Sequence, residues 1–401
     1  MSSRADLRWL LPGFVAVALV CRLPITSLPP ALATISRDLQ LTPTLAGLTT
    51  TLPLICFGLF AFVTPFLVAR WGTERTLLAA TALTVVGVVV RSLPTTPTFY
   101  LGTVALGLGI AVMNVVLPAV VRSRFPDQVP QRMSLYTVCM ISGASAAAAA
   151  TAPLLQHGLS WSWTLAIWVL PLTAALVLWG AATREVVRHP TGGHASTPQA
   201  PTGMVHVVRH PRTWWTAAFM GLQSLCFYMP LTWLPAILRS HGVAPATAGV
   251  MLGVYMGLGI PGSFLGPRMA THRHATRVLA AFFAAYALGV VALLGSATTA
   301  LLGVVVMGFG QGAGIAIALT FIAQQRDPHD VPAVSAFAQG TGFLLAAVGP
   351  VTAGAVYQAS GSWTVPVLLI LGVALAQAMS GLVLSRPTAA AASSRGAPAR
   401  S

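Results

Sequence analysis

The sequence contains no lysine, and only 7% of its 401 residues are charged. Its seven acidic residues all fall between hydrophobic segments or at their ends, so no carboxylate stands where an intramembrane proton relay would need one. In contrast, 56% of the residues are hydrophobic and the mean hydropathy is +0.79. This composition excludes an ordinary soluble protein and predicts a polytopic membrane protein.

Other absences narrow the class of protein further. The four cysteines have no metal-ligand spacing. The glycine runs are not followed by the Gly-Lys-Ser/Thr of a nucleotide loop. No nucleophile–base constellation occurs either, so we expect no catalytic residue, no metal and no cofactor. The formal charge of +15 does not predict a nucleic-acid partner, because the arginines are concentrated in the loops on one side.

Twelve hydrophobic segments predict an all-α membrane protein with twelve transmembrane helices in two six-helix bundles. We expect an N-terminal bundle at 1–183, a flexible cytoplasmic linker at 184–212, a C-terminal bundle at 213–385 and a disordered cytoplasmic tail at 386–401. The segments lie at about 10–33, 45–69, 76–93, 98–121, 134–157, 162–183, 213–238, 246–270, 277–295, 298–322, 333–358 and 362–385.

The distribution of arginine predicts the orientation of the chain. With the N-terminus inside, 18 of the 22 arginines fall on the cytoplasmic side. Only Arg37, Arg91 and Arg239 fall outside, and Arg22 lies within a segment. The positive-inside rule therefore places both termini in the cytoplasm. We expect a multi-pass protein of the plasma (inner) membrane that interacts with the lipid bilayer and is a monomer.

Each half of the chain repeats short motifs of the other in the same order, which indicates two parallel repeats with a site at their interface. The offset between the halves drifts only from 206 to 200 residues, so the matches are collinear. The pairs are Thr26–Pro29 with Thr232–Pro235, Pro43–Gly47 with Pro245–Gly249, Gly107–Gly109 with Gly308–Gly310, and Ser162–Thr164 with Ser362–Thr364.

Arg22 lies near the middle of the first hydrophobic segment. A guanidinium keeps its proton, so protein groups, water or an anion must solvate it at membrane depth. Prolines at 24, 29 and 30 can kink the segment and free backbone carbonyls. In the repeat Arg22 corresponds to Tyr228, so a pocket between the halves would be cationic on one wall and aromatic on the other. The alternative is a structural arginine bound to carbonyls.

The chain resembles the major facilitator superfamily, and most of all its branch of bacterial cyanate permeases and 2-nitroimidazole exporters. The resemblance covers nearly all twelve segments and is less specific for the substrate than for the branch. The motifs that carry it are Arg22–Ser27, Gly109–Pro118, Arg122–Pro126, Gly221–Tyr228, Trp233–Pro235, Gly310–Gly312, Ser335–Phe343 and Gly349–Pro350.

Several polar or aromatic residues in the segments are candidates for the wall of a substrate pocket, because an anion site needs a charge, a few neutral donors and a dry surround. Asn114 and the glutamines can instead join helices to one another. Tyr136 can instead anchor the membrane interface, and Trp233 can cap an extracellular gate. The expected substrate-binding residues are Arg22, Thr26, Asn114, Tyr136, Gln223, Tyr228, Trp233, Gln311 and Gln339.

The loop Ala69–Arg75 resembles the gating loop of the superfamily, although Ala69 stands where the family usually has an acidic residue. That part of the gating network is therefore absent or altered. Glu74 or Asp127 is a candidate partner for the arginines that end the fourth segment, in an outward-facing state. The expected gating residues are Arg70, Gly72, Arg75 and Arg122.

Two functions remain open from the sequence. The first is secondary transport of a small, cyanate-like organic anion or a small polar compound by alternating access, with Arg22 as the anion-binding residue. The second is efflux of nitroimidazole-like or other drugs and metabolites, with Arg22 structural. A transport-inactive receptor is disfavoured, because neither the linker nor the tail holds a signalling domain, and no motif predicts an enzyme.

Overall fold

The computed structural model describes residues 9–188, 204–271, 274–324 and 330–385, and these residues contain helices and no strand. Twelve helical spans are long and apolar enough to cross a membrane, which confirms the all-α membrane architecture. The helices are α1 (Leu10–Val20), α2 (Leu23–Thr26), α3 (Leu28–Asp38), α4 (Pro43–Trp71), α5 (Thr73–Arg91), α6 (Thr96–Arg124), α7 (Val129–Gln156), α8 (Trp161–Ala166), α9 (Val169–Arg188), α10 (Met204–Val208), α11 (Pro211–Ser240), α12 (Pro245–Gly257), α13 (Gly259–Thr271), α14 (Ala275–Ala292), α15 (Ala297–Ala323), α16 (Val331–Ser360) and α17 (Thr364–Ser385).

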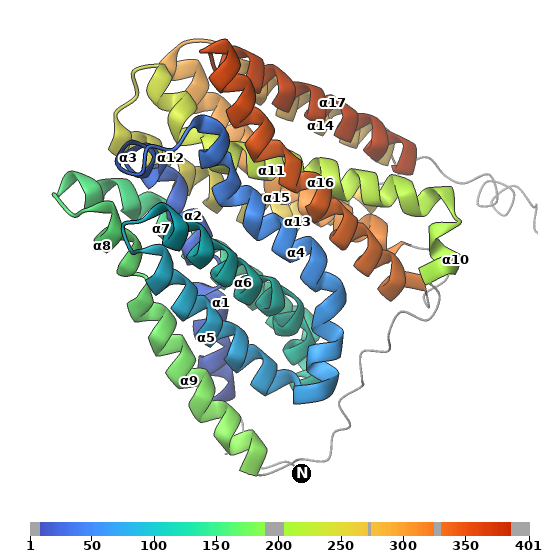
Figure 1. Ribbon diagram of the computed structural model, residues 1–401. Helices are drawn as coiled ribbons and strands as arrows, with labels where there is room; N and C mark the ends of the chain where they lie inside the picture. The colour runs from blue at the N-terminus through green and yellow to red at the C-terminus, as the bar shows by residue number, and fades with distance from the viewer. Residues whose placement is uncertain (1–8, 189–203, 272–273, 325–329, 386–401) are drawn as a thin grey trace, which may run out of the picture.

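Helices α1–α9 form one half of the molecule and α11–α17 form the other (Figure 1). We call the end where α9 stops and α11 begins the linker end, and the end where α3 stops and α4 begins the closed end. Figure 1 shows the halves meeting near α3 and α12, while α9 and α10 lie well apart at the linker end. The two halves therefore diverge toward the linker end, which the arginine distribution predicts to be cytoplasmic.

The first membrane span is broken into α1, α2 and α3 around the central arginine. Pro24 and Pro29 each stand in the first turn of the helical piece that follows a break, where a missing N–H does no harm. The hydroxyl of Thr26 donates to the carbonyl oxygen of Arg22 at 3.0 Å and satisfies a backbone group at the break. The prolines thus position Arg22 at a break between helices.

Repeat-related glycines make close approaches between the halves near the closed end. A Cβ atom on Gly47 of α4 would lie 2.6 Å from the carbonyl oxygen of Pro350 and 2.7 Å from Cα of Val351 in α16. A Cβ atom on Gly249 of α12 would lie 2.7 Å from Cβ of Ala152 in α7. The two seams, α4–α16 and α7–α12, therefore depend on the missing side chains.

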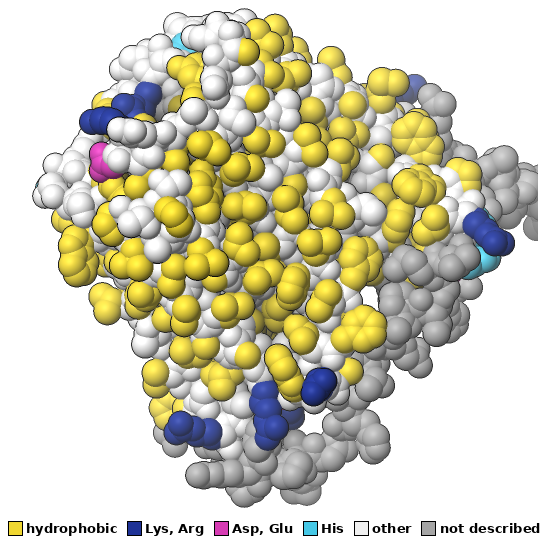
Figure 2. Space-filling model, viewed as in Figure 1, with side chains coloured by type: hydrophobic (Ala, Val, Ile, Leu, Met, Phe, Trp, Pro, Cys, Tyr) yellow, Lys and Arg dark blue, Asp and Glu magenta, His cyan; other side chains and the backbone are white. Residues whose placement is uncertain are grey.

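The surface matches a protein that sits in a bilayer. Large apolar side chains cover the middle of the molecule, while basic side chains lie toward its ends (Figure 2). Phe66, Trp163 and Leu170 are among the large apolar side chains that stay strongly exposed. A continuous exposed apolar surface of this kind belongs in lipid rather than in water.

The structure differs from the sequence-based expectation in two places. Residues 184–188 continue α9 and residues 204–208 form α10, so the ends of the expected flexible linker are helical. Val207 of α10 packs with Ala333 and Val334 of α16. The middle of the linker and the expected disordered tail lie outside the described residues. Arg91, expected on the outer side near the end of the third segment, is only 1% exposed, because it ends α5 and its guanidinium reaches the Pro24 carbonyl within the N-terminal half.

Candidate substrate-binding site

Arg22 and Tyr228 meet where the two halves face each other. A guanidinium Nη1 of Arg22 donates a hydrogen bond of 2.7 Å to the hydroxyl oxygen of Tyr228. These residues stand 206 positions apart and correspond to one another in the internal repeat. The residues predicted for the cationic wall and the aromatic wall of the pocket are therefore in direct contact. Because the bond joins the halves, any motion of one half against the other stretches or breaks it.

Aromatic rings surround this pair. The guanidinium carbon of Arg22 lies 5.4 Å from the ring centroid of Phe57 in α4, within range of a cation–π interaction. Phe343 of α16 makes edge contacts with Phe57 at 5.6 Å and with Tyr228 at 6.4 Å between centroids. No carboxylate of the described residues pairs with Arg22. The positive charge of Arg22 is thus stabilised by two neutral groups, the phenol of Tyr228 and the ring face of Phe57.

Two buried N–H groups beside the pair lack a hydrogen-bond partner. They are Nε of Arg22 and Nδ2 of Asn114, and both side chains are only partly buried. The amide oxygen of Asn114 accepts a contact of 3.8 Å from the thiol of Cys21, which leaves the NH₂ group free to donate. Unpaired buried donors are rare because desolvation without a partner is costly. Each of these groups is therefore free to donate to a ligand.

Tyr136 and Thr26 lie close to the central arginine but in different roles. Tyr136 is buried against Phe14, with ring centroids 6.3 Å apart, and its hydroxyl is in range of an electrostatic interaction with Arg22 and Tyr228. It is therefore not at the membrane interface. Thr26 is 1% exposed and its hydroxyl donates within its own helical turn. Thr26 supports the backbone at Arg22 rather than facing open space.

Gln223 and Gln311 face each other inside the C-terminal half rather than Arg22. Nε2 of Gln223 donates to the carbonyl oxygen of Gln311 at 3.4 Å, and Nε2 of Gln311 donates to that of Tyr255 at the same distance. Together with Gln377 of α17 they line a small internal cavity that Tyr286 also borders. The two amides thus follow the alternative given above, in which they join helices of one bundle.

Trp233 and Gln339 also make their contacts away from the central pair. The indole N–H of Trp233 donates to the carbonyl oxygen of Pro350 at 2.9 Å, and its ring packs on Trp363 with centroids 5.3 Å apart. It therefore ties α11 to α16 toward the closed end, and its role at a gate stays a prediction. Gln339 donates to the hydroxyl of Ser335, one turn earlier in α16.

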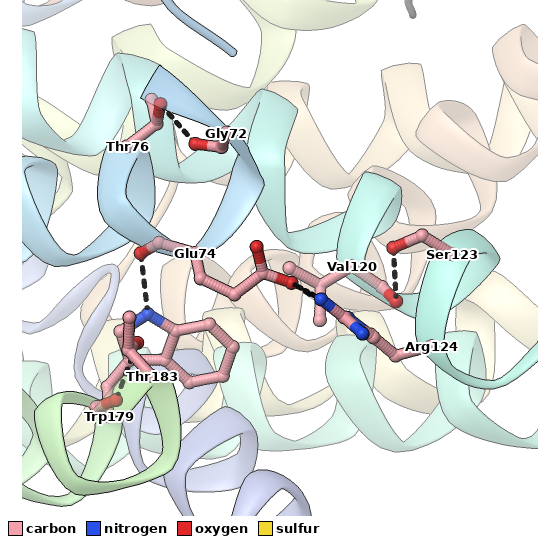
Figure 3. Close-up of polar contacts among 8 residues, drawn as sticks. All are labelled: Gly72, Glu74, Thr76, Val120, Ser123, Arg124, Trp179 and Thr183. Atoms are coloured by element: carbon pink, nitrogen blue, oxygen red, sulfur yellow. Dashed lines mark hydrogen bonds and ion pairs between the residues drawn. The ribbon is translucent and has the colours of Figure 1, made fainter. Parts of the chain in front are cut away.

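The loop Ala69–Arg75 and the end of α6 form a compact polar cluster within the N-terminal half (Figure 3). Gly72 joins α4 to α5 with φ of 80°, a conformation that favours glycine. The carboxylate of Glu74 accepts from Nε of Arg124 at 2.7 Å, and the backbone carbonyl of Glu74 accepts from the indole of Trp179 at 3.0 Å. Glu74 thus pairs with an arginine that ends the fourth span, whereas the expected gating residues Arg70, Arg75 and Arg122 are exposed.

The sequence suggested a pairing of Glu74 or Asp127 with the arginines that end the fourth segment in an outward-facing state, and the link to that state stays a prediction. Glu74 and Arg124 both belong to the N-terminal half. The pair therefore fixes α5 to α6 and does not join the two halves.

The sequence did not single out Phe57 and Phe343, which lie at the site, or Gln377, which lines the internal cavity of the C-terminal half. Phe57 and Phe343 lie in spans that are apolar all round, where hydrophobic periodicity gives no signal for the inner face. Gln377 stands in an apolar run and had no motif around it. For Phe343 alone a signal existed, because it closes the family motif Ser335–Phe343.

Comparison with known proteins identifies the family. The Major Facilitator Superfamily profile matches residues 14–302. The chain is 34% identical to the 2-nitroimidazole transporter of Escherichia coli over 94% of this chain and 95% of that protein. It is 29% identical to the cyanate transport protein CynX of the same organism, over 90% and 94%.

Solved structures agree on the fold. The nucleoside transporter NupG superposes with a TM-score of 0.78 at 11% identity, over 94% of this chain and 99% of that one. Profile, relatives and architecture together show that this chain belongs to the major facilitator superfamily.

Proposed function

We propose that the protein is a secondary transporter that moves a small organic anion, cyanate-like in size and charge, by alternating access, with Arg22 as its binding residue. One observation carries this proposal: the charged guanidinium of Arg22 contacts Tyr228 at the interface of the halves and keeps an unpaired donor, Nε, with no carboxylate of the described residues beside it. An anion supplies the charge-assisted acceptor that such a donor lacks.

The same geometry supplies a mechanism. An anion bound to Arg22 competes with the Tyr228 hydroxyl for the guanidinium, so occupancy changes the strength of the contact between the halves. Tyr228 can then turn its own O–H toward the anion. Binding would thereby bias the equilibrium between the state open at the linker end and the state open at the other end, as alternating access requires.

The direction of transport depends on the driving force. Anion uptake against an inside-negative potential costs about 2.3 kcal/mol per charge at about 100 mV. Exchange or a proton-carrying substrate avoids this cost. We propose that the protein is a monomer in the bacterial inner membrane with both termini cytoplasmic; the orientation rests on the 18 of 22 arginines that the sequence predicts on the cytoplasmic side.

A second candidate is efflux of neutral, nitroimidazole-like compounds, with Arg22 structural. Its support is the 34% identity to the 2-nitroimidazole transporter and the aromatic rings of Phe57 and Phe343, on which a heterocycle can stack. In this case Arg22 serves mainly to hold the halves together through Tyr228.

Proteoliposomes separate the two candidates. We would measure flux of labelled cyanate and of 2-nitroimidazole through the wild type, Arg22→Gln and the exposed control Arg239→Gln. Gln keeps a donor but loses the charge, so anion flux should fall by about tenfold or more, while the control is unaffected. Cyanate flux that survives Arg22→Gln overturns the anion site. If only 2-nitroimidazole is carried, and equally by Arg22→Gln, the second candidate is supported.

A further inference from the structure

Arg91 is the one other arginine buried in the described membrane spans, and the proposed mechanism does not use it. It is 1% exposed, and no carboxylate of the described residues pairs with it. Its Nη1 donates to the carbonyl oxygen of Pro24 at 2.7 Å, while Nε and Nη2 have no partner. A buried cation without a partner charge is costly, because it loses its hydration. The cost at position 91 calls for a reason other than packing.

The acceptor of Arg91 lies two residues from the proposed binding residue. Pro24 belongs to α2, the single helical turn that follows Arg22. The hydroxyl of Ser27 also donates to the Pro24 carbonyl, at 3.4 Å. A short turn between two breaks has few backbone hydrogen bonds of its own, so side chains from neighbouring helices must hold it.

The C-terminal half holds the partner residue in a comparable way. Pro230 has no N–H for the carbonyl of Cys226 four residues earlier. The hydroxyl of Tyr286 donates to that carbonyl at 2.8 Å, and the hydroxyl of Tyr255 lies 3.4 Å from it. Cys226 is two residues from Tyr228. Tyr286 lies in α14 and Arg91 in α5, and each of these helices is the third membrane span of its half.

We infer that Arg91 is a positioning residue for substrate binding: it clamps the Pro24 carbonyl and so fixes the backbone turn that presents the guanidinium of Arg22 to the anion. The inference rests on the proposed function of Arg22. It predicts that loss of the clamp loosens the break at residues 21–27 and weakens anion binding, while the rest of the bundle stays folded.

Cys21 offers a readout that does not depend on transport, because it lies at the break and is fully buried. With Cys56, Cys139 and Cys226 replaced by Ala, the alkylation rate of Cys21 by a maleimide reports how often the break opens. We would compare Arg91→Met, Arg91→Lys and the exposed control Arg37→Met in purified protein, and measure cyanate affinity by calorimetry on the same samples.

Arg91→Met should raise the Cys21 alkylation rate by about tenfold or more and weaken cyanate binding by a similar factor, as expected for a lost charge-assisted hydrogen bond. Lys keeps the charge and a donor, so Arg91→Lys should stay within about threefold of the wild type. Arg37→Met should change neither quantity. A purely structural role would lower the melting temperature and leave both quantities unchanged.

An alkylation rate equal to that of the wild type in folded Arg91→Met overturns the inference. If Arg91→Met does not yield monodisperse protein, Arg91→Gln takes its place with the same expectation, since its amide is shorter and uncharged. If the wild type and Arg22→Ala bind cyanate equally, the proposed function fails instead, and the Cys21 rates alone then decide the role of Arg91.

Discussion

The two halves of the molecule carry the same motif around their central residues but do not fold it alike. Thr26 donates to the carbonyl of Arg22 at 3.0 Å, and its repeat partner Thr232 donates to that of Tyr228 at 2.8 Å. Prolines follow both central residues at the same spacing. Yet the first span breaks into three helices, whereas the seventh continues from Pro211 to Ser240.

The difference lies in the neighbours of each motif. The first span has an additional proline at position 30, and the buried guanidinium of Arg91 donates a hydrogen bond to its Pro24 carbonyl. In the seventh span two neutral hydroxyls, from Tyr286 and Tyr255, share the Cys226 carbonyl. One charged side chain, Arg91, thus holds the backbone near Arg22 in the N-terminal half. Two neutral side chains, Tyr286 and Tyr255, together hold the backbone near Tyr228 in the C-terminal half. We expect the N-terminal half to be the more sensitive to substitution.

The largest effect on cyanate binding is expected when the two residues of the central pair, Arg22 and Tyr228, are replaced one at a time. Arg22→Met removes the only charge at the site and should weaken cyanate binding by about a hundredfold, whereas Tyr228→Phe leaves the guanidinium in place and should weaken it by about tenfold or less. Calorimetry on both variants and on the double variant gives the coupling between them. Equal losses would show that the halves contribute equally.

The next largest effect is expected from adding a methyl group at the two glycine seams, α4–α16 and α7–α12. Gly47→Ala places a methyl group against backbone atoms of α16 that cannot move aside, so opening of the closed end should be favoured by about 1–3 kcal/mol. Gly249→Ala meets only Cβ of Ala152 at less than 3 Å, so Ala152→Gly should rescue it. Spin labels on cysteines at positions 37 and 239 would report the closed-end distance. If Ala152→Gly does not rescue Gly249→Ala, the proposed difference between the two seams is wrong.

A smaller effect is expected at the neutral clamp. Tyr286→Phe removes one hydroxyl while Tyr255 can still donate to the Cys226 carbonyl, so cyanate affinity should fall by about two- to fivefold. The Tyr255→Phe/Tyr286→Phe double variant should lose more than the sum of the single changes. Isothermal titration of the three variants tests this, and a single-variant loss as large as that of Arg91→Met would remove the proposed difference between the clamps.

The smallest effect should be that of the ion pair in the gating loop. Glu74 and Arg124 keep 14% and 25% of their side-chain surface exposed, so Glu74→Gln should lower the free energy of unfolding by about 1 kcal/mol or less. The melting temperature should therefore shift by only a few degrees, and less at high salt. The matched control is Asp127→Asn, an exposed acid of the same region. A shift in cyanate transport would give the pair a gating role after all.

The sequence predicted the twelve spans, because a bilayer demands long apolar helices. The collinear repeats placed Arg22 and Tyr228 on opposite walls of a pocket between the halves, and only the fold shows that the two side chains touch. The sequence did not predict which way Gln223 and Gln311 point. Their helices are apolar on all sides, so no periodicity marks the face turned toward the other half. Arg91 stands near the outer end of the third hydrophobic segment, and only the fold reveals the carbonyl it reaches.

The Arg22–Tyr228 contact has a consequence for the origin of the two-half chain. Residues that are equivalent in a repeat and touch each other must lie on the pseudo-two-fold axis. If the ancestor was a symmetric dimer of six-helix subunits, an arginine at this position would have faced its own copy, with two cations in contact. Tyr228 in place of a second arginine turns that repulsion between like charges into a hydrogen bond.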